Sequence, residues 1–356
     1  MINWVSQAVL KLEADFQRSS DTHLIKIPLP AVADIHLYVK DESTHPTGSL
    51  KHRLARSLFL YGLCNGLINE GTHIVEASSG STAISEAYFA QLLGLHFTAV
   101  VPEGTSQKKI DQIAFYNGNC HFVKASDIYK ESERLTKECD GHYMDQFTYA
   151  ERATDWRGNN NIAESIFSQM KLEPYPIPNA IVVSAGTGGT SATIGRFIRY
   201  KGFDTEMCVA DPSHSVFYDF FRTKDKTLTL DVPSRIEGIG RPRVESSFVS
   251  SVIDTMVKVP DEAAFATLHF LSEILNRRCG GSTGTNLYAA FLKIHEMHVK
   301  GVKGSVVSII CDSGERYADT YYNNDWLSHN GYLLKMKPYA AELTNFYKTG
   351  MMNAIN

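Results

Sequence analysis

Residues 180–190 read Ala180-Ile181-Val182-Val183-Ser184-Ala185-Gly186-Thr187-Gly188-Gly189-Thr190. The first four residues are apolar and mostly β-branched, which is typical of a buried strand. The glycines that follow allow backbone N–H groups to converge on an anion at the start of a helix, which we expect near Ser191. The stretch therefore predicts a strand, a phosphate-binding loop and a helix; we call residues 186–190 the phosphate loop.

Two nucleotide-binding motifs are similar to this loop but do not match it. A P-loop requires Gly-Lys-Ser/Thr at a fixed spacing, and no such sequence follows here. The dinucleotide motif G-x-G-x-x-G requires a third glycine where this chain has Ser191, and no convincing ribose-binding acid follows. Both differences weaken the nucleotide hypothesis.

A second unusual run is Pro46-Thr47-Gly48-Ser49-Leu50-Lys51. Pro46 and Gly48 favour a turn, Ser49 is a plausible helix cap, and Lys51 is expected in the first helical turn. Taken alone, such a lysine is usually a solvated side chain. A lysine together with a phosphate loop suits pyridoxal phosphate, a cofactor that enzymes hold through a lysine and through its phosphate group.

Two further loops are rich in hydroxyl groups. Residues 76–83 read Glu76-Ala77-Ser78-Ser79-Gly80-Ser81-Thr82-Ala83 and follow a short strand; we call residues 78–82 the hydroxyl loop. Residues 279–286 read Cys279-Gly280-Gly281-Ser282-Thr283-Gly284-Thr285-Asn286 and precede an apolar helix. The hydroxyl loop offers donors for a carboxylate. An ordinary capped turn explains it equally well, and a capping serine is the default interpretation of residues 279–286.

The chain resembles the fold-type II pyridoxal phosphate enzymes of the cysteine synthase and cystathionine β-synthase family over roughly residues 30–320. The motifs occur in the family's order. They are the lysine motif P-[ST]-[GS]-S-x-K at 46–51, T-S-G-N-T-G at 78–83, a Gln-Phe at 146–147, G-T-G-G-T at 186–190, I-x-G-I-G at 236–240, G-x-S-x-G at 280–284 and S-G-E-R-Y at 313–317.

The resemblance implies a role for each matching residue. Lys51 carries the cofactor and is the catalytic residue, and Ser282 meets the pyridine nitrogen. The remaining cofactor-binding residues are Ser81, Gly186, Thr187, Gly188, Gly189 and Thr190. The substrate-binding residues are Ser78, Ser79, Gly80, Thr82, Gln146 and Gly238.

Within the family, residues 47–57 and 153–160 are most similar to bacterial L-cysteine desulfhydrases. We therefore expect β-elimination of L-cysteine to sulfide, ammonia and pyruvate. The alternatives are a β-replacement reaction of the cysteine synthase type, a serine or threonine dehydratase, and a non-catalytic amino-acid-binding relative. Two residues depart from the synthase pattern: Ser81 stands in place of an asparagine and Ala83 in place of a glycine.

The expected fold class is α/β. Short apolar runs alternate with helical patterns, at residues 35–39, 74–75, 97–101, 121–123, 181–183, 207–209 and 306–310. This alternation predicts parallel sheets covered by helices on both faces. The resemblance implies two three-layer α/β domains of the tryptophan synthase β type. The small domain is expected at residues 46–153, and the large one is expected to combine residues 1–45 with 154–356.

Composition excludes several other classes of protein. The 356 residues are 43% hydrophobic and 21% charged with a net charge of −4, which gives no electrostatic case for nucleic acid or an anionic membrane. No apolar run approaches the ~20 residues needed to span a bilayer, and the start of the chain lacks the features of a signal peptide. The 13 histidines show no ligand spacing, so no metal is implied. Six scattered cysteines favour reduced thiols and a cytoplasmic protein; the resemblance implies a homodimer.

Overall fold

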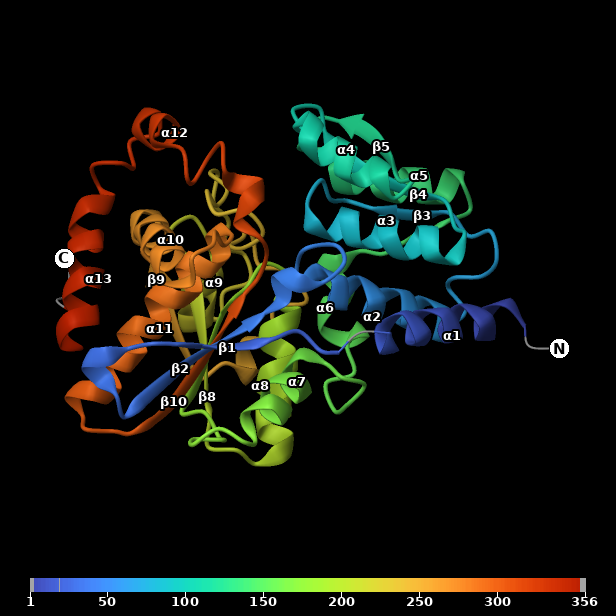
Figure 1. Cartoon of the computed structure of the whole chain (residues 1–356). Helices are drawn as coiled ribbons and strands as arrows, with labels where there is room; N and C mark the ends of the chain where they lie inside the picture. The colour runs from blue at the N-terminus through green and yellow to red at the C-terminus, as the bar shows by residue number, and fades with distance from the viewer. Residues whose placement is uncertain (1–2, 19, 353–356) are drawn as a thin grey trace. The chain divides into compact units, whose positions relative to one another are not determined.

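The computed structural model describes residues 3–18 and 20–352 (Figure 1). The chain forms two compact units. Unit 1 comprises residues 1–21 and 45–155, and unit 2 comprises residues 22–44 and 156–356. None of the helices in the described part of the chain combines the length and the apolar character that a membrane span requires.

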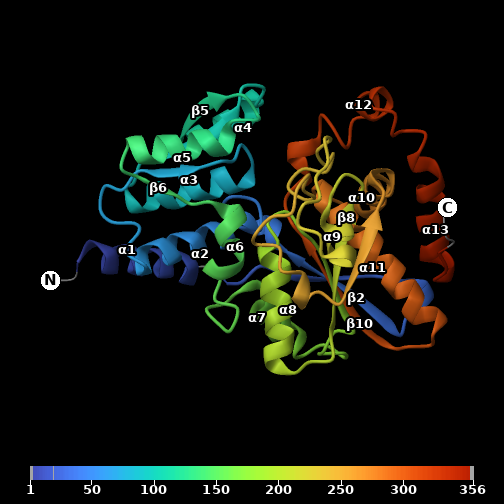
Figure 2. The same ribbon diagram turned by 180° about the vertical axis from the view of Figure 1, so that it is seen from behind.

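Unit 1 is built on a parallel four-stranded sheet in the order β5-β4-β3-β6. Its strands are β3 (Ile74–Glu76), β4 (Phe97–Pro102), β5 (Asn119–Val123) and β6 (His142–Tyr143). The chain moves outward from β3 to β5 and then returns to β6 on the other side of β3. Because such crossovers are right-handed, α3 (Ser81–Leu93) and α5 (Ile128–Glu138) cover opposite faces of the sheet (Figures 1 and 2).

The N-terminal helix belongs to unit 1. Ala8 and Leu12 of α1 (Trp4–Gln17) are buried in the same hydrophobic cluster as Leu58 of α2 (Lys51–Cys64) and Ala87 of α3. The sequence prediction assigns residues 1–45 to the large domain, whereas the structure divides that segment after Asp21. The apolar face of α1 explains the difference, since α2 and α3 cover it. The other helices of unit 1 are α4 (Gln107–Phe115) and α6 (Gln146–Ala153).

Unit 2 contains a six-stranded sheet in the order β1-β2-β10-β7-β8-β9. Only β1 is antiparallel to its neighbour. The strands are β1 (Leu24–Ile27), β2 (Ile35–Asp41), β7 (Ala180–Ser184), β8 (Glu206–Pro212), β9 (Thr255–Val259) and β10 (Gly304–Ile310). The last strand in sequence, β10, lies in the middle of the sheet and is fully buried.

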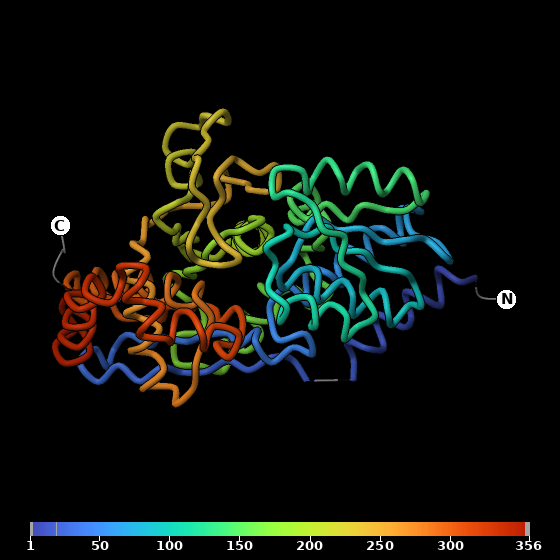
Figure 3. Tube along the Cα trace, turned by 90° about the horizontal axis from the view of Figure 1, so that it is seen from above, coloured from blue at the N-terminus to red at the C-terminus, as the bar shows by residue number. Residues whose placement is uncertain are grey.

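Helices cover both faces of this second sheet. One face carries α8 (Gly189–Lys201) with α7 (Ile162–Met170) packed beside it, and the other carries α11 (Gly281–Val299) with α10 (Asp261–Leu275) (Figure 2). The C-terminal helix α13 (Met336–Thr349) packs against α10 and against η1 (Pro30–Val32), which joins β1 to β2 (Figure 3). The remaining elements are η2 (Glu42–Thr44), α9 (Phe217–Thr223), η3 (Ser250–Val252), η4 (Gly314–Tyr317) and α12 (Asn324–His329).

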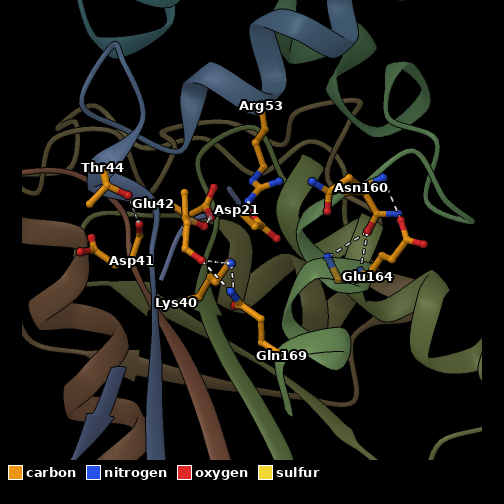
Figure 4. Close-up of polar contacts among 12 residues, drawn as sticks. Asp21, Lys40, Asp41, Glu42, Thr44, Arg53, Asn160, Glu164 and Gln169 are labelled. Atoms are coloured by element: carbon orange, nitrogen blue, oxygen red, sulfur yellow. Dashed lines mark hydrogen bonds and ion pairs between the residues drawn. The ribbon is translucent and has the colours of Figure 1, made fainter. Parts of the chain in front are cut away.

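A buried lysine ties the first segment of unit 2 to α7. Lys40 on β2 is fully buried, and its Nζ donates to the carbonyl oxygen of Thr22 at 2.6 Å and to Oε1 of Gln169 at 2.7 Å (Figure 4). Gln169 also donates to the Thr22 oxygen at 2.8 Å. These bonds satisfy the ammonium group inside the unit, which is the condition for burying a charge.

The α/β class and the two three-layer units agree with the sequence prediction. Each expected apolar run forms a strand. The sequence prediction missed β1, β6 and β9. β6 has only two residues, and β1 and β9 each contain a lysine within a short run, so none of them stands out as an apolar segment.

Candidate active site

The phosphate loop lies between the carboxyl end of β7 and the start of α8. The helix begins at Gly189, two residues before the expected Ser191, and its N-cap is Gly188 with φ +86°. A Cβ at Gly188 would lie 2.7 Å from Cα of Phe248 and 2.8 Å from the oxygen of Ser247. Only glycine therefore fits this position, both in conformation and in space.

Residues 236–240 pack directly on the phosphate loop. The N–H of Gly240 donates to the oxygen of Ala185 at 2.8 Å, and a Cβ at Gly186 would overlap the carbonyl oxygen of Gly238. Gly238 itself has φ +84° and is exposed. Unit 2 thus brings together two of the motifs singled out from the sequence, at the carboxyl edge of its sheet.

Ser282 lies in the first turn of α11, next to the same group of loops. The helix has Gly280 as its N-cap, so the default interpretation of a capping serine is wrong. A Cβ at the neighbouring Gly281 would lie 3.1 Å from Cγ2 of Ile236. Ser282 is only 5% exposed, and its hydroxyl has no hydrogen-bond partner within residues 3–18 and 20–352. A buried hydroxyl of this kind is free to bond a ligand.

Lys51 is the first residue of α2 in unit 1. Its N–H donates to Oγ of Ser49 at 3.3 Å, but the N-cap position belongs to Leu50, one residue later than expected. The turn before it is anchored by Thr47, whose Oγ1 lies 2.8 Å from Oγ of Ser85 on α3. These two contacts fix the turn at residues 47–51 and so position the backbone of Lys51.

The next residues of α2 add further anchors. Nδ1 of His52 lies 3.2 Å from Oγ1 of Thr47. Nη2 of Arg53 pairs with Oδ1 of Asp21 at 2.7 Å (Figure 4). Side chains on both flanks of Lys51 therefore hold the start of this helix in place.

The hydroxyl loop precedes α3, whose N-cap is Gly80. Oγ of Ser78 accepts from the Gly80 N–H at 3.2 Å, and Ser79 and Ser81 are half-buried. Thr82 donates from Oγ1 to Oε1 of Gln146 at 2.8 Å. The structure thus joins the hydroxyl loop to the Gln-Phe motif, more than sixty residues later in the chain.

Glycine, which has no side chain for capping, is the N-cap of α3, α8 and α11. The helix α7 differs, because Asn161 accepts from the N–H groups of Ala163 and Glu164 at 2.9 and 3.0 Å. The free N–H groups at a helix start are available to an anion, and the helix dipole favours it there.

Sequence reasoning gave no role to Glu76, Thr47 or Ser247. Glu76 is buried and accepts from two backbone N–H groups, and the hydroxyl of Ser247 donates to the oxygen of Thr187 in the phosphate loop. A carboxylate that ends an apolar strand was a usable signal for Glu76. Ser247 carried none, since its partner is a backbone atom distant in sequence.

Comparisons with known proteins agree with this arrangement. The pattern of the pyridoxal-phosphate dependent enzyme family matches residues 17–312. The chain belongs to this family. A member from Mycobacterium tuberculosis (strain H37Ra), L-cysteine desulfhydrase Cds1, is 58% identical over 334 residues, which cover 92% of this chain and 91% of the relative.

Solved structures of the family share the fold. O-ureido-L-serine synthase superimposes with a TM-score of 0.72 at 23% identity, covering 86% of this chain and 96% of the other. The O-acetylserine dependent cystathionine β-synthase from Helicobacter pylori gives a TM-score of 0.71 at 24% identity, covering 85% and 95%. Both confirm the fold-type II architecture.

The residues present fit pyridoxal phosphate, the cofactor of the family. The phosphate loop has glycines where a side chain would collide, and a helix start with N–H groups for a phosphate. The orphaned hydroxyl of Ser282 offers a partner for a ring nitrogen. Lys51, the hydroxyl loop and Gln146 belong to unit 1, whereas the phosphate loop, Gly238 and Ser282 belong to unit 2.

Proposed function

We propose that this enzyme converts L-cysteine and water to sulfide, ammonia and pyruvate by β-elimination. The observation that carries the proposal is the 58% identity, over 92% of the chain, to an L-cysteine desulfhydrase. The lysine turn and the phosphate loop support it, because the chemistry requires both a covalent attachment point and an anion site.

Groups from three motifs would hold the cofactor. Lys51 would bind its aldehyde, residues 186–190 its phosphate, and Ser282 its ring nitrogen. Ser81 would lie beside the ring. When bound, pyridoxal phosphate supplies a covalent handle for the amino group and a ring that withdraws electrons from Cα.

A serine, rather than a carboxylate, as the partner of the ring nitrogen affects which reaction is favoured. Ser282 is the second residue of α11, and its hydroxyl is neutral, so it bonds the nitrogen without holding a proton on it. A ring without that proton withdraws electrons less strongly. The weaker withdrawal disfavours transamination and suits the loss of a good leaving group such as a thiol.

Lys51 would also move the proton that starts the reaction. With the substrate bound, the amine of Lys51 would act as the base that removes the proton from Cα. The hydroxyl loop and Gln146 would hold the substrate carboxylate, which fixes the direction of the Cα–H bond. Thr82 and Gln146 are joined to each other, so they would act on the carboxylate as one unit.

We propose that elimination is faster than replacement. Ser81, half-buried at the first position of α3, has a shorter side chain than the asparagine of the synthases. The shorter side chain leaves room for water, which favours hydrolysis and release over capture by a second nucleophile.

We also propose a role for each unit, a homodimeric assembly and a cytoplasmic location. Unit 1 would act as the small domain with the lysine and the carboxylate site, and unit 2 as the large domain with the phosphate site. The homodimer rests on the family resemblance, and size-exclusion chromatography with light scattering tests it. The six free thiols fit a compartment that keeps cysteines reduced.

One experiment tests the reaction. The purified holoenzyme is given L-cysteine alone, and in parallel O-acetylserine with sulfide. We expect equal amounts of sulfide and pyruvate from L-cysteine, and only slow formation of cysteine in the second assay. Cysteine formation much faster than pyruvate formation would identify a synthase instead.

A further inference from the structure

Two buried carboxyl groups of unit 1 belong to the elements on either side of the hydroxyl loop. Glu76 ends β3, and Glu86 lies on α3. Both are 0% exposed. The hydroxyl loop connects the two elements that carry them, and Glu76 contacts the backbone on both sides of the proposed carboxylate site, at Ala77 and Gln146.

Glu76 joins two backbone segments that are far apart in sequence. Its Oε1 accepts from the N–H of Ala77 at 2.7 Å, and its Oε2 accepts from the N–H of Gln146 at 3.2 Å. One carboxylate therefore holds the residue that leads into the hydroxyl loop and the first residue of α6.

Glu86 differs from Glu76 in its surroundings. Both of its carboxyl oxygens are buried and lack a hydrogen-bond partner among the residues that the structure describes. Burial raises the pKa of Glu86 well above its ordinary value, and the charge of Glu76 raises it further. A protonated Glu86 has one O–H to donate, and Glu76 is the acceptor beside it.

The acidic group beside the pair, Asp145, makes ionisation of Glu76 less favourable. Asp145, with φ +44°, raises the pKa of Glu76 after the larger effect of burial. The phenol oxygen of Tyr143 on β6 is buried, and the charge of Glu76 adds to the effect of burial in raising the pKa of Tyr143. Elsewhere on α3, Tyr88 meets three other titratable groups: His52 on α2, Asp15 on α1 and Tyr116 after α4. Tyr129 on α5 contributes to the raised pKa of Tyr143.

We propose that Glu76 and Glu86 share one proton at neutral pH and that the pair positions the hydroxyl loop and Gln146 for the substrate carboxylate. The positioning half rests on the proposed function. Glu86 donates to Glu76, and Glu76 keeps both of its oxygens on the backbone N–H groups. Neither residue touches the substrate, so both are positioning residues.

The shared proton makes the stability of the folded protein fall as the pH rises. The unfolded chain releases this proton near the ordinary carboxyl pKa of about 4, whereas the folded protein keeps it to a higher pH. The stability from the pair is therefore complete below that ordinary pKa and is lost as the pH rises toward the raised pKa. One proton taken up on folding changes the folding constant about tenfold per pH unit in this window.

Three variants test whether Glu76 and Glu86 share a proton and position the loop, or are only buried polar residues. In Glu86→Gln the amide donates to Glu76 but does not titrate. In Glu76→Gln one of the two backbone N–H groups loses its acceptor. Glu133→Gln removes an exposed carboxyl on α5 and is the matched control. Each holoenzyme is compared with the wild type for its melting temperature from pH 5 to pH 8, and for KM and kcat with L-cysteine.

We expect Glu86→Gln to retain the wild-type KM at neutral pH and to lose less stability than the wild type as the pH rises. The control should follow the wild-type curve. Glu76→Gln should raise KM about tenfold with a smaller change in kcat, as expected for a lost hydrogen bond to a charged group. A Glu86→Gln curve parallel to the wild type overturns the shared proton, and an unchanged KM in Glu76→Gln overturns the positioning role.

A second measurement covers the case in which Glu86→Gln does not fold. The infrared spectrum of the wild type at neutral pH should contain the C=O stretch of a protonated carboxylic acid, which deuteration shifts; its absence overturns the shared proton. Failure of the wild type to produce sulfide and pyruvate would refute the proposed function alone. The melting curves and the infrared band would still decide whether the pair holds a proton.

Discussion

The two units fix their candidate site residues by different means. In unit 1, side chains fix the segments: Thr82 bonds Gln146, Thr47 lies against Ser85, and Glu76 accepts from two N–H groups. In unit 2, the phosphate loop is held by close backbone approaches at Gly186 and Gly188, and the hydroxyls of Ser247 and Ser191 donate to its own carbonyl oxygens, at Thr187 and Gly188.

This difference matches what each part has to bind. A phosphate group stays bound through every turnover, and a frame of backbone N–H groups with no titratable side chain holds it over a wide range of pH. A substrate carboxylate enters and leaves, and hydroxyl and amide side chains can exchange their bonds with each other for bonds to it. Four substitutions test whether the two units differ in this way.

Lys51→Ala should have the largest effect. Loss of the base and of the covalent attachment should lower kcat at least about a thousandfold. The phosphate loop lies in unit 2, so the variant should still bind the cofactor reversibly, as dialysis followed by absorbance would measure. The exposed Lys137→Ala on α5 is the control. Cofactor that borohydride fixes to a different lysine in Lys51→Ala would contradict the assignment.

Gly188→Ala should produce the opposite pattern. The new Cβ would meet Phe248 and Ser247, so the loop should move off its anion and the cofactor dissociation constant should rise about tenfold or more. Excess cofactor should restore turnover. Gly202→Ala is the matched control, since Gly202 also has a positive φ, +65°, but open space around its Cβ. Equal cofactor loss in both variants would show that backbone strain alone is responsible.

Ser282→Asp should change the products more than the rate. A carboxylate at this position would hold a proton on the ring nitrogen, strengthen electron withdrawal and divert part of the turnover into transamination. Product analysis and the absorbance spectrum of the bound cofactor measure the change. Ser282→Ala removes the hydroxyl without adding charge and should not produce the diversion. Wild-type spectra and product ratios in Ser282→Asp would limit Ser282 to a structural role.

Thr82→Val should have the smallest effect. The valine keeps the shape but loses the bond to Gln146, so KM should rise by roughly threefold to tenfold with little change in kcat. Thr98→Val is the control, because its hydroxyl lies 2.8 Å from Nε2 of His73 in the same unit but outside the hydroxyl loop. An equal rise in KM for both variants would indicate a general loss of stability in unit 1.

Much of this arrangement could be predicted from the sequence, because strands such as β7 and β10 are continuous apolar runs and each candidate loop follows or precedes a regular element. Helix starts are harder to predict: α8 begins at Gly189 and not at Ser191, since Gly188 can adopt the N-cap conformation itself. The bonds between Glu76 and Gln146 and between Ser247 and Thr187 could not be predicted, because each joins a side chain to a backbone atom distant in the chain.

The position of β10 in its sheet also governs the order in which the chain can fold. β2 is made early, yet its parallel partner across Ile35 is Gly304, close to the other end of the chain. Unit 1 is complete once residue 155 has been synthesised, whereas the sheet of unit 2 lacks a central strand until residue 310. During synthesis, the edge of β2 that pairs with β10 therefore lacks its native partner until residue 310 has been made, and an unpaired strand edge of this kind is prone to aggregation.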